Sequence, residues 1–164
     1  MKKRRRRFIV NECNHVYQRT INGKILFYDR EDFLVYYMIV SVWARKRGVR
    51  ILIMCLMIDH VHMLIETDTL EQMADFVRDY TSVFVREYND SIRRCGQLFS
   101  KSYGSAPKKG DKKTRSAIVY IGNNPVEKKL CRKAEDYRWN FLKYIQCKFP
   151  FSKNLPVKKY SRRL

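Results

Sequence analysis

The pattern of hydrophobic and polar positions predicts four strands. Residues 13–20 form an extended run of mixed polarity, and residues 49–58 are β-rich and almost wholly apolar. Residues 60–66 follow after a tight turn and read as a third strand, and an edge strand is expected within residues 97–105. A continuous apolar run such as 49–58 is typical of a strand buried on both faces.

Helical spacing of apolar residues appears between these strands. A first helix is predicted from Asp29, which can cap its N-terminus, to Gly48, a natural C-terminal stop. Residues 69–72 (Thr-Leu-Glu-Gln) form a capping-box sequence that opens a second helix. Asp111 can cap a third helix, which Pro125 should end.

The order strand, helix, strand, strand, helix, strand predicts an α+β fold of the ferredoxin-like βαββαβ type, with additional C-terminal helices. The last of these helices is expected over residues 134–147. In this fold the two core helices cover one face of the sheet. Because the strand at residues 49–58 asks for cover on both faces, the late helices or a partner subunit should lie across the other face.

Composition indicates one domain with a polyanionic partner. The 164 residues carry 35 Lys and Arg against 16 Asp and Glu, a formal net charge of +19, which favours nucleic acid as the partner. We expect a basic N-terminal tail over residues 1–10, one domain over 11–148 and a basic C-terminal tail over 149–164. The longest apolar run, residues 51–58, is far shorter than the roughly 20 residues of a membrane span. Five cysteines without a Cys-x-x-Cys spacing argue for a reducing cytosol.

Two of the three histidines form the sequence His60-Val61-His62. On a strand these two side chains point to the same face, about 6.6 Å apart, and could converge on one metal ion. An arbitrary His-x-His is more often a pair of ordinary strand histidines. Glu66 shares the face but lies about 13 Å from His62, so a third ligand would have to come from elsewhere.

Tyr120 and Asn124 lie one turn apart on the expected third helix, so that a phenol and a carboxamide would project together. Spacing alone favours a surface tyrosine followed by an Asn-Pro helix stop. The basic runs, at residues 2–7 and at lysines 108, 109, 112 and 113, are individually unspecific. Together with the abundant aromatic residues they suit phosphate contact and base stacking, as in single-strand binding.

Three segments stand in one order along the chain: residues 57–65 (MIDHVHMLI), 99–103 (FSKSY) and 120–126 (YIGNNPV), the last followed by EDYRW. They resemble, in turn, the HUH motif, an aromatic-basic patch and the catalytic helix of single-tyrosine HUH transposases. The resemblance is strongest to the REP-associated tyrosine transposase branch. His15 and Arg19 in the first strand also fit, and the match spans residues 12–145.

This resemblance implies site-specific cleavage and joining of single-stranded DNA through a 5′-phosphotyrosine. It makes Tyr120, on one of the extra helices, the nucleophile. His60, His62 and Asn124 become the ligands of a divalent metal, Mg²⁺ or Mn²⁺. Two departures stand out: Ile58 replaces a proline common in the family's turn, and Asn124 directly precedes a proline, which disfavours helical geometry.

The expected partner is single-stranded or hairpin DNA, without a membrane, for a monomer or homodimer in the bacterial cytoplasm, associated with the nucleoid through DNA. The residues expected to contact DNA are Lys2, Lys3, Arg4, Arg5, Arg6, Arg7, Arg19, Lys101, Tyr103, Lys108, Lys109, Lys112 and Lys113. Two alternatives stay open: a non-catalytic, domesticated nucleic-acid-binding domain, and a metal-dependent nuclease that uses water. His15→Ala is expected to be much milder than loss of His60 or His62.

Overall fold

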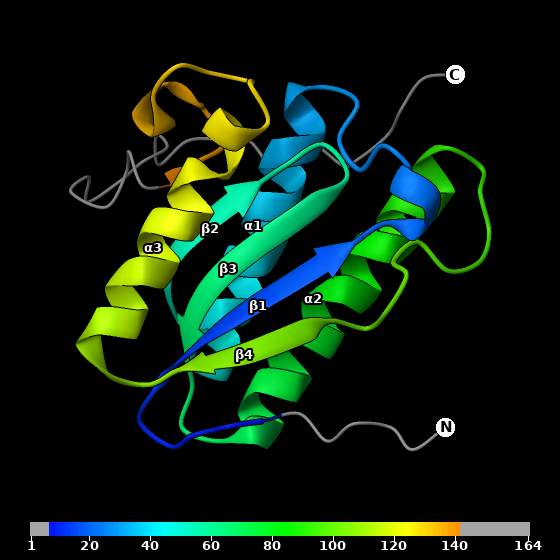
Figure 1. Cartoon of the computed structure of the whole chain (residues 1–164). Coiled ribbons are helices and arrows are strands. Elements are labelled where there is room, and N and C mark those ends of the chain that lie inside the picture. Colours follow the sequence, from blue (N-terminus) through cyan, green and yellow to red (C-terminus); the bar gives the residue numbers. More distant parts are fainter. Residues whose placement is uncertain (1–6, 142–164) are drawn as a thin grey trace.

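The computed structural model describes residues 7–141, in which a four-stranded sheet is combined with three α-helices (Figure 1). The strands are β1 (Cys13–Arg19), β2 (Arg50–Leu56), β3 (His60–Glu66) and β4 (Gly104–Lys108). The helices are α1 (Arg30–Arg47), α2 (Leu70–Ser91) and α3 (Gly110–Glu127), with short 3-10 turns at Ile21–Gly23 and Ala134–Asp136. The expected basic tails lie largely or wholly outside the described residues, so the domain boundaries stay a prediction.

The strand order in the sheet is β2-β3-β1-β4, and every neighbouring pair is antiparallel. This order confirms the predicted α+β, ferredoxin-like fold. Figure 1 shows α1 and α2 on one face of the sheet and α3 across the other, beside β2 and β3. The expectation that a late helix covers the second face is therefore confirmed.

Local signals place the ends of the first two helices as predicted. Asp29 and Asp32 cap α1 reciprocally, each carboxylate accepting the backbone N–H of the other. Gly48 ends α1 in the left-handed conformation, at φ 64°. At α2, Thr69 accepts the backbone N–H of Gln72, but the Gln72 side chain accepts the N–H of the residue before the cap. Only half of the predicted capping box forms.

Hydrophobic side chains are buried on both faces of the sheet. The cluster between the sheet and α1 and α2 is built around the fully buried rings of Tyr36, Phe76, Tyr80 and Phe84. The smaller cluster, under α3, contains Ile53, Cys55, Leu64, Ala117 and Ile121. From Ile53 to Leu56, successive residues of β2 alternate between the two clusters, as the apolar run in its sequence predicts. No helix within residues 7–141 combines the length and the hydropathy that a membrane crossing requires.

Three sequence expectations around α3 are wrong. The edge strand begins only at Gly104, because the chain before it makes a single bridge, Thr20 to Phe99, with the end of β1. The helix has no side-chain cap from Asp111 and continues two residues beyond Pro125. Proline removes one helical hydrogen bond but does not unwind this turn.

The last expected helix, over residues 134–147, is also wrong for the part that the structure describes. After one 3-10 turn the chain runs along the open edge of β2, where the Leu56 N–H donates to the carbonyl of Trp139 at 3.0 Å. The Trp139 ring stacks on Phe33 of α1, with centroids 4.4 Å apart. Pairing with a sheet edge and burial of the indole hold this segment out of a helix. Residues 142–147 lie outside the described part.

Candidate active site

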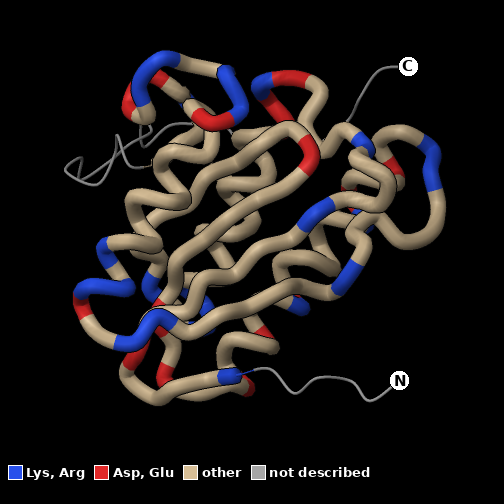
Figure 2. Tube along the Cα trace, in the orientation of Figure 1, with Lys and Arg blue, Asp and Glu red and all other residues tan. Residues whose placement is uncertain are grey.

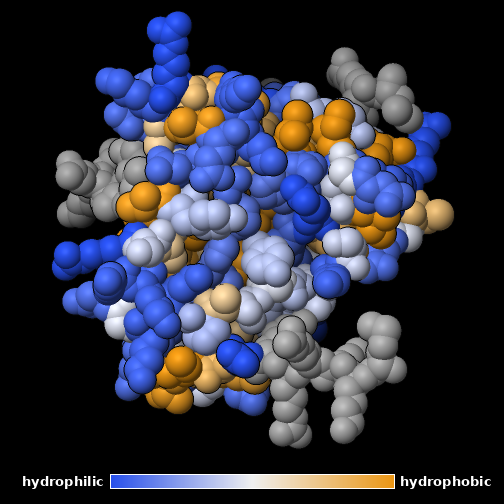
Figure 3. Space-filling view, viewed as in Figure 1, coloured by the Kyte–Doolittle hydropathy of each residue, from blue (hydrophilic) through white to orange (hydrophobic). Residues whose placement is uncertain are grey.

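The sheet face under α3 changes from apolar to polar along the strands. At the start of β1, Cys13 packs under α3 near Leu64 of β3. His15 and then Tyr17 follow on the same face at intervals of two residues. The antiparallel register places His62 of β3 directly opposite Tyr17. Hydrophilic and intermediate side chains dominate the middle of this face (Figure 3).

The two histidines of the His-x-His sequence share this face, as predicted. Their ring centroids lie 5.1 Å apart, and His60 and His62 are only 7% and 8% exposed. Val61 between them points to the opposite side and is buried in the larger cluster. The rigid sheet therefore fixes the distance between the two imidazoles.

Each of these imidazoles is held by a neighbour through its Nδ1 atom. Nδ1 of His60 lies 2.5 Å from Oδ1 of Asp59, whose other oxygen lies 3.6 Å from Nε of Arg19. Nδ1 of His62 lies 2.9 Å from Nε2 of His15. Both bonds leave Nε2 of His60 and His62 available to a ligand. Carboxylate or imidazole partners of this kind orient metal-binding histidines in many proteins.

Burial keeps two of these rings neutral. It lowers the pKa of His62 to about 3, helped by the nearby His15, His60 and Arg19. It lowers the pKa of His15 to about 4, with a smaller contribution from Lys108. A hydrogen bond between two neutral imidazoles needs one N–H and one lone pair. When His62 donates from Nδ1, its Nε2 carries the lone pair that a metal ion would use.

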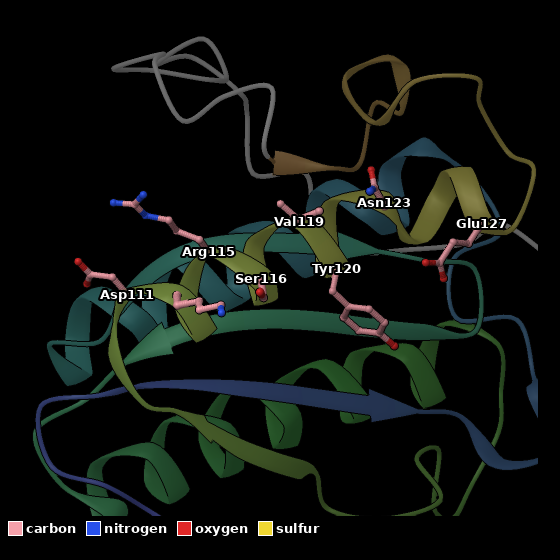
Figure 4. Close-up of a pocket in the computed structure, with 8 residues that line it drawn as sticks. Asp111, Arg115, Ser116, Val119, Tyr120, Asn123 and Glu127 are labelled. Carbon is pink, nitrogen blue, oxygen red and sulfur yellow. The ribbon is translucent and has the colours of Figure 1, made fainter.

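Helix α3 brings Tyr120 to this group of histidines. The ring of Tyr120 lies 5.9 Å from the ring of His15 and 6.0 Å from that of His62, both in edge-on geometry. Figure 4 shows the ring projecting from α3 toward β3 and β1. Ala117 and Ile121 on neighbouring positions of the helix are buried against the sheet and fix the orientation of α3. Tyr120 itself is 49% exposed and therefore accessible to a large substrate.

Asn124 lies one turn after Tyr120 and is buried on the sheet side of α3, 4% exposed. The helix keeps its geometry at this residue despite the proline that follows. Within residues 7–141, no three His, Cys, Asp or Glu side chains are grouped to hold a metal ion. A metal on the two imidazoles would therefore need a ligand of another kind, and a buried carboxamide oxygen is one. Amide oxygens are ligands that suit Mn²⁺ and Mg²⁺, and the identity of the metal stays a prediction.

An open groove of about 720 Å³ runs along α3 beside Tyr120 (Figure 4). Lys112, Ser116 and Tyr120 line it at intervals of four residues, and Arg115 lines it on the adjacent row. Arg115 was not among the residues expected to contact DNA. Its position three residues after Lys112, on one face of a helix, could have indicated it. Two carboxylates also line the groove, so it brings two cations near Tyr120 without being basic as a whole: Asp111 and Glu127.

The residues expected to contact DNA fall into several places. Figure 2 shows Lys and Arg gathered at the turn from β4 to α3, where lysines 108, 109, 112 and 113 lie. Arg19 lies at the open end of β1, paired with Asp59, and Lys101 follows a residue, Ser100, that is bonded to the backbone of Arg19. Arg7 is exposed at the start of the described chain. Residues Lys2 to Arg6 lie outside the described part.

Tyr103 is not on this surface, contrary to the sequence expectation. Its side chain belongs to the larger hydrophobic cluster and is only 7% exposed. It precedes β4 on the side of the sheet that α1 and α2 cover, so DNA has no access to its ring. Two residues whose roles were not assigned from sequence, His15 and Asp59, instead contact the histidine pair directly.

Comparisons with known proteins concern the fold and the family of this chain. A REP-associated tyrosine transposase bound to a REP hairpin superposes with a TM-score of 0.74 over 100% of this chain and 99% of its own, at 13% identity. At that identity the likeness shows the fold. The crystal structure of a candidate transposase from Deinococcus radiodurans matches 74% of this chain and 96% of its own at 22% identity, with a TM-score of 0.46. The search of curated proteins gave no significant match.

The sequence also matches the family described as "Transposase IS200 like". The match covers residues 1–124 and so includes both His60 and His62 as well as Tyr120. It ends at Asn124, the residue with the buried carboxamide. The chain belongs to the family of IS200-like transposases.

Proposed function

We propose that this protein cleaves and rejoins single-stranded DNA through a covalent bond between Tyr120 and a 5′-phosphate. Membership of the transposase family gives the coarser function, DNA binding with cleavage and rejoining of strands. The observation that carries the finer proposal is the position of the Tyr120 ring, 5.9 and 6.0 Å from two histidine rings on a rigid sheet. A phenol, neighbouring imidazoles and two cations of the groove therefore lie close together.

The proposed reaction is a transesterification. Oη of Tyr120 attacks phosphorus, the bond from phosphorus to the 3′ oxygen breaks, and that oxygen leaves as a 3′-hydroxyl after taking up a proton. The phenolic proton is lost to solvent or to a base. A 3′-hydroxyl later attacks the phosphotyrosine and restores a phosphodiester, so the exchange needs no external energy source.

The side chains around Tyr120 have separate tasks in this proposal. Nε2 of His60, Nε2 of His62 and the carboxamide of Asn124 would hold a divalent cation. That cation, when bound, supplies a Lewis acid for a phosphate oxygen. Asp59 and His15 keep the two imidazoles in one orientation. The cluster beneath α3 keeps Tyr120 over them, so little reorganisation is needed when the strand binds.

Two cations of the groove would supply contacts that place the strand. Lys112 and Arg115 line it on the same helix as Tyr120. Phosphate contacts of this kind fix the register of a strand without reading its sequence. A strand that follows α3 would reach Tyr120 after passing these two cations.

Detection of a covalent adduct tests the proposed function. Single-stranded oligonucleotides from the sequence flanking the gene are incubated with the protein and Mn²⁺, and adducts are separated under denaturing conditions. An oligonucleotide labelled at its 3′ end should transfer its label to the protein, and one labelled at its 5′ end should not. Tyr120→Phe removes one oxygen and should bind DNA normally while forming no adduct.

A matched control is Tyr28→Phe, which alters a tyrosine of similar exposure whose hydroxyl lies against Tyr88 of α2. This variant should form the adduct at the wild-type rate. An adduct that persists in Tyr120→Phe would assign another nucleophile. Cleavage without any adduct would favour a nuclease that uses water, and binding without cleavage would favour a non-catalytic domain.

A further inference from the structure

Tyr17 is an exposed aromatic ring on the active face that the proposed reaction does not use. It is 46% exposed, although its neighbours in β1, Val16 and Gln18, are buried. Its ring centroid lies 5.7 Å from that of His15 and 6.2 Å from that of His62. A large exposed ring beside two buried imidazoles needs an explanation.

The structure seats this ring on the backbone of β4. Gly104 is the register partner of Tyr17, and a Cβ atom on Gly104 would lie 2.5 Å from Oη of the tyrosine and closer still to the ring carbon Cζ. The backbone of Gly104 is not in the left-handed region, so the reason for glycine here is space. Only glycine lets the ring lie this close to the strand, and the strand in turn fixes the plane of the ring.

The side chains around the ring are small on the β4 side. Ala106, the next residue of β4 on this face, lies opposite His15 in the register and is also small. Helix α3 covers the β2 side of the sheet and leaves this side open (Figure 1). Within residues 7–141, a flat ligand can therefore approach the face of Tyr17 from solvent without displacing another element.

Tyr17 and Tyr120 both lie about 6 Å from the same two imidazoles. The ring of Tyr17 is 5.7 and 6.2 Å from His15 and His62, and that of Tyr120 is 5.9 and 6.0 Å from them. A phosphate placed for attack by Tyr120 carries nucleosides on both sides. One of their bases is within reach of the exposed face of Tyr17, and bases stack readily on aromatic side chains.

We propose that Tyr17, seated on Gly104, is the stacking platform for one nucleobase next to the phosphate that Tyr120 attacks. The ligand class is a heterocyclic base of single-stranded DNA, recognised by its π-face. This inference rests on the proposed function for the identity of the phosphate. Stacking of one base on such a platform contributes about tenfold to a hundredfold in binding.

An abasic scan tests the platform by binding alone. All proteins carry Tyr120→Phe, so the strand is bound but not cut, and fluorescence anisotropy measures Kd for single-stranded oligonucleotides with one abasic residue at each position in turn. An abasic residue at one of these positions should weaken binding by about tenfold to a hundredfold. Tyr17→Leu should weaken binding of the intact oligonucleotide by the same factor and abolish the penalty of that abasic position. Tyr17→Phe, which keeps the ring, should keep the affinity for the intact oligonucleotide and the penalty of the abasic position.

The control is Tyr28→Leu, which changes an exposed tyrosine that is hydrogen-bonded to Tyr88 of α2. This variant should keep the full abasic penalty. Gly104→Ala tests the contact between the Tyr17 ring and the backbone of Gly104. It should lower Tm, and adding Tyr17→Leu should restore Tm because the clashing ring is gone. The proposal is overturned if the abasic penalty persists in Tyr17→Leu or if no abasic position matters. Failure of the proposed function is a different result, namely no adduct with the wild-type protein, and leaves this binding assay intact.

Discussion

At the scale of single residues, the candidate site depends on two side chains that the His-x-His motif does not contain. Asp59 and His15 each occupy the Nδ1 atom of one motif histidine. The motif was readable because i and i+2 on a strand share a face. The contact between His15 and His62 could not be predicted from the sequence. It depends on the register of β1 against β3, which places the two residues diagonally.

This contact revises the expectation that loss of His15 is mild. His60→Ala and His62→Ala should each abolish metal-dependent cleavage with little change in fold. His15→Ala should weaken Mn²⁺ binding by about tenfold to a hundredfold, because the His62 ring loses the acceptor that fixes its tautomer. Calorimetric titration of the metal-free protein with Mn²⁺, without DNA, measures this effect.

His15→Gln is the matched variant, since its carbonyl oxygen can accept the same hydrogen bond, and it should keep part of the affinity. The ¹⁵N chemical shifts of the His62 ring in metal-free protein give a second measurement. They should report a proton on Nδ1 in the wild type and a mixture of tautomers in His15→Ala. Unchanged Mn²⁺ affinity in His15→Ala would refute the positioning role.

At the scale of elements, sequence signals worked where the determinant is local. The Asp29 cap, the left-handed Gly48 and the apolar run of β2 each act within a few residues, and each was readable in advance. Pro125 and the segment after residue 133 were misread because tertiary contacts decide them. The side chain of Asn140 donates to the carbonyl of Gly122, at 2.8 Å, in the turn before the proline.

Asn140→Ala should therefore destabilise the fold through the end of α3. Asn140 is fully buried, and its amide also donates to the carbonyl of Ala134 at 3.0 Å, so alanine leaves one buried and one partly buried acceptor without this donor. The free energy of unfolding should fall by about 1–3 kcal/mol. Urea denaturation followed by circular dichroism measures it.

Asn123→Ala, on the groove side of the same helix, should change the free energy of unfolding by no more than about 0.5 kcal/mol. Equal midpoints for Asn140→Ala and wild type would mean that water satisfies these carbonyls. In that case the path of the chain through Pro125 would be set by the helix and the cluster beneath it alone.

At the scale of the whole molecule, the net charge of +19 says that a polyanion binds but not where. Cations occur on both sides of the sheet: Lys112 and Lys113 near the start of α3, and Arg45 and Lys46 near the end of α1. The first pair lies on the same helix as Tyr120, and Lys112 lines the groove. The position of a cation relative to the groove, and not the total charge, should decide whether it neutralises a phosphate and displaces counterions from the DNA.

The salt dependence of binding distinguishes the two pairs. For a single strand, the slope of log K against log salt is about −0.7 for each phosphate neutralised. The double variant Lys112→Ala/Lys113→Ala should make the slope shallower by about 0.7 for each phosphate that the variant no longer neutralises. Arg45→Ala/Lys46→Ala removes the same charge from the helix-covered side and should leave the slope unchanged. Anisotropy titrations with Tyr120→Phe protein at several salt concentrations give both slopes. An equal change of slope in the two variants would mean that diffuse charge holds the strand, and the groove would then no longer be the proposed path to Tyr120.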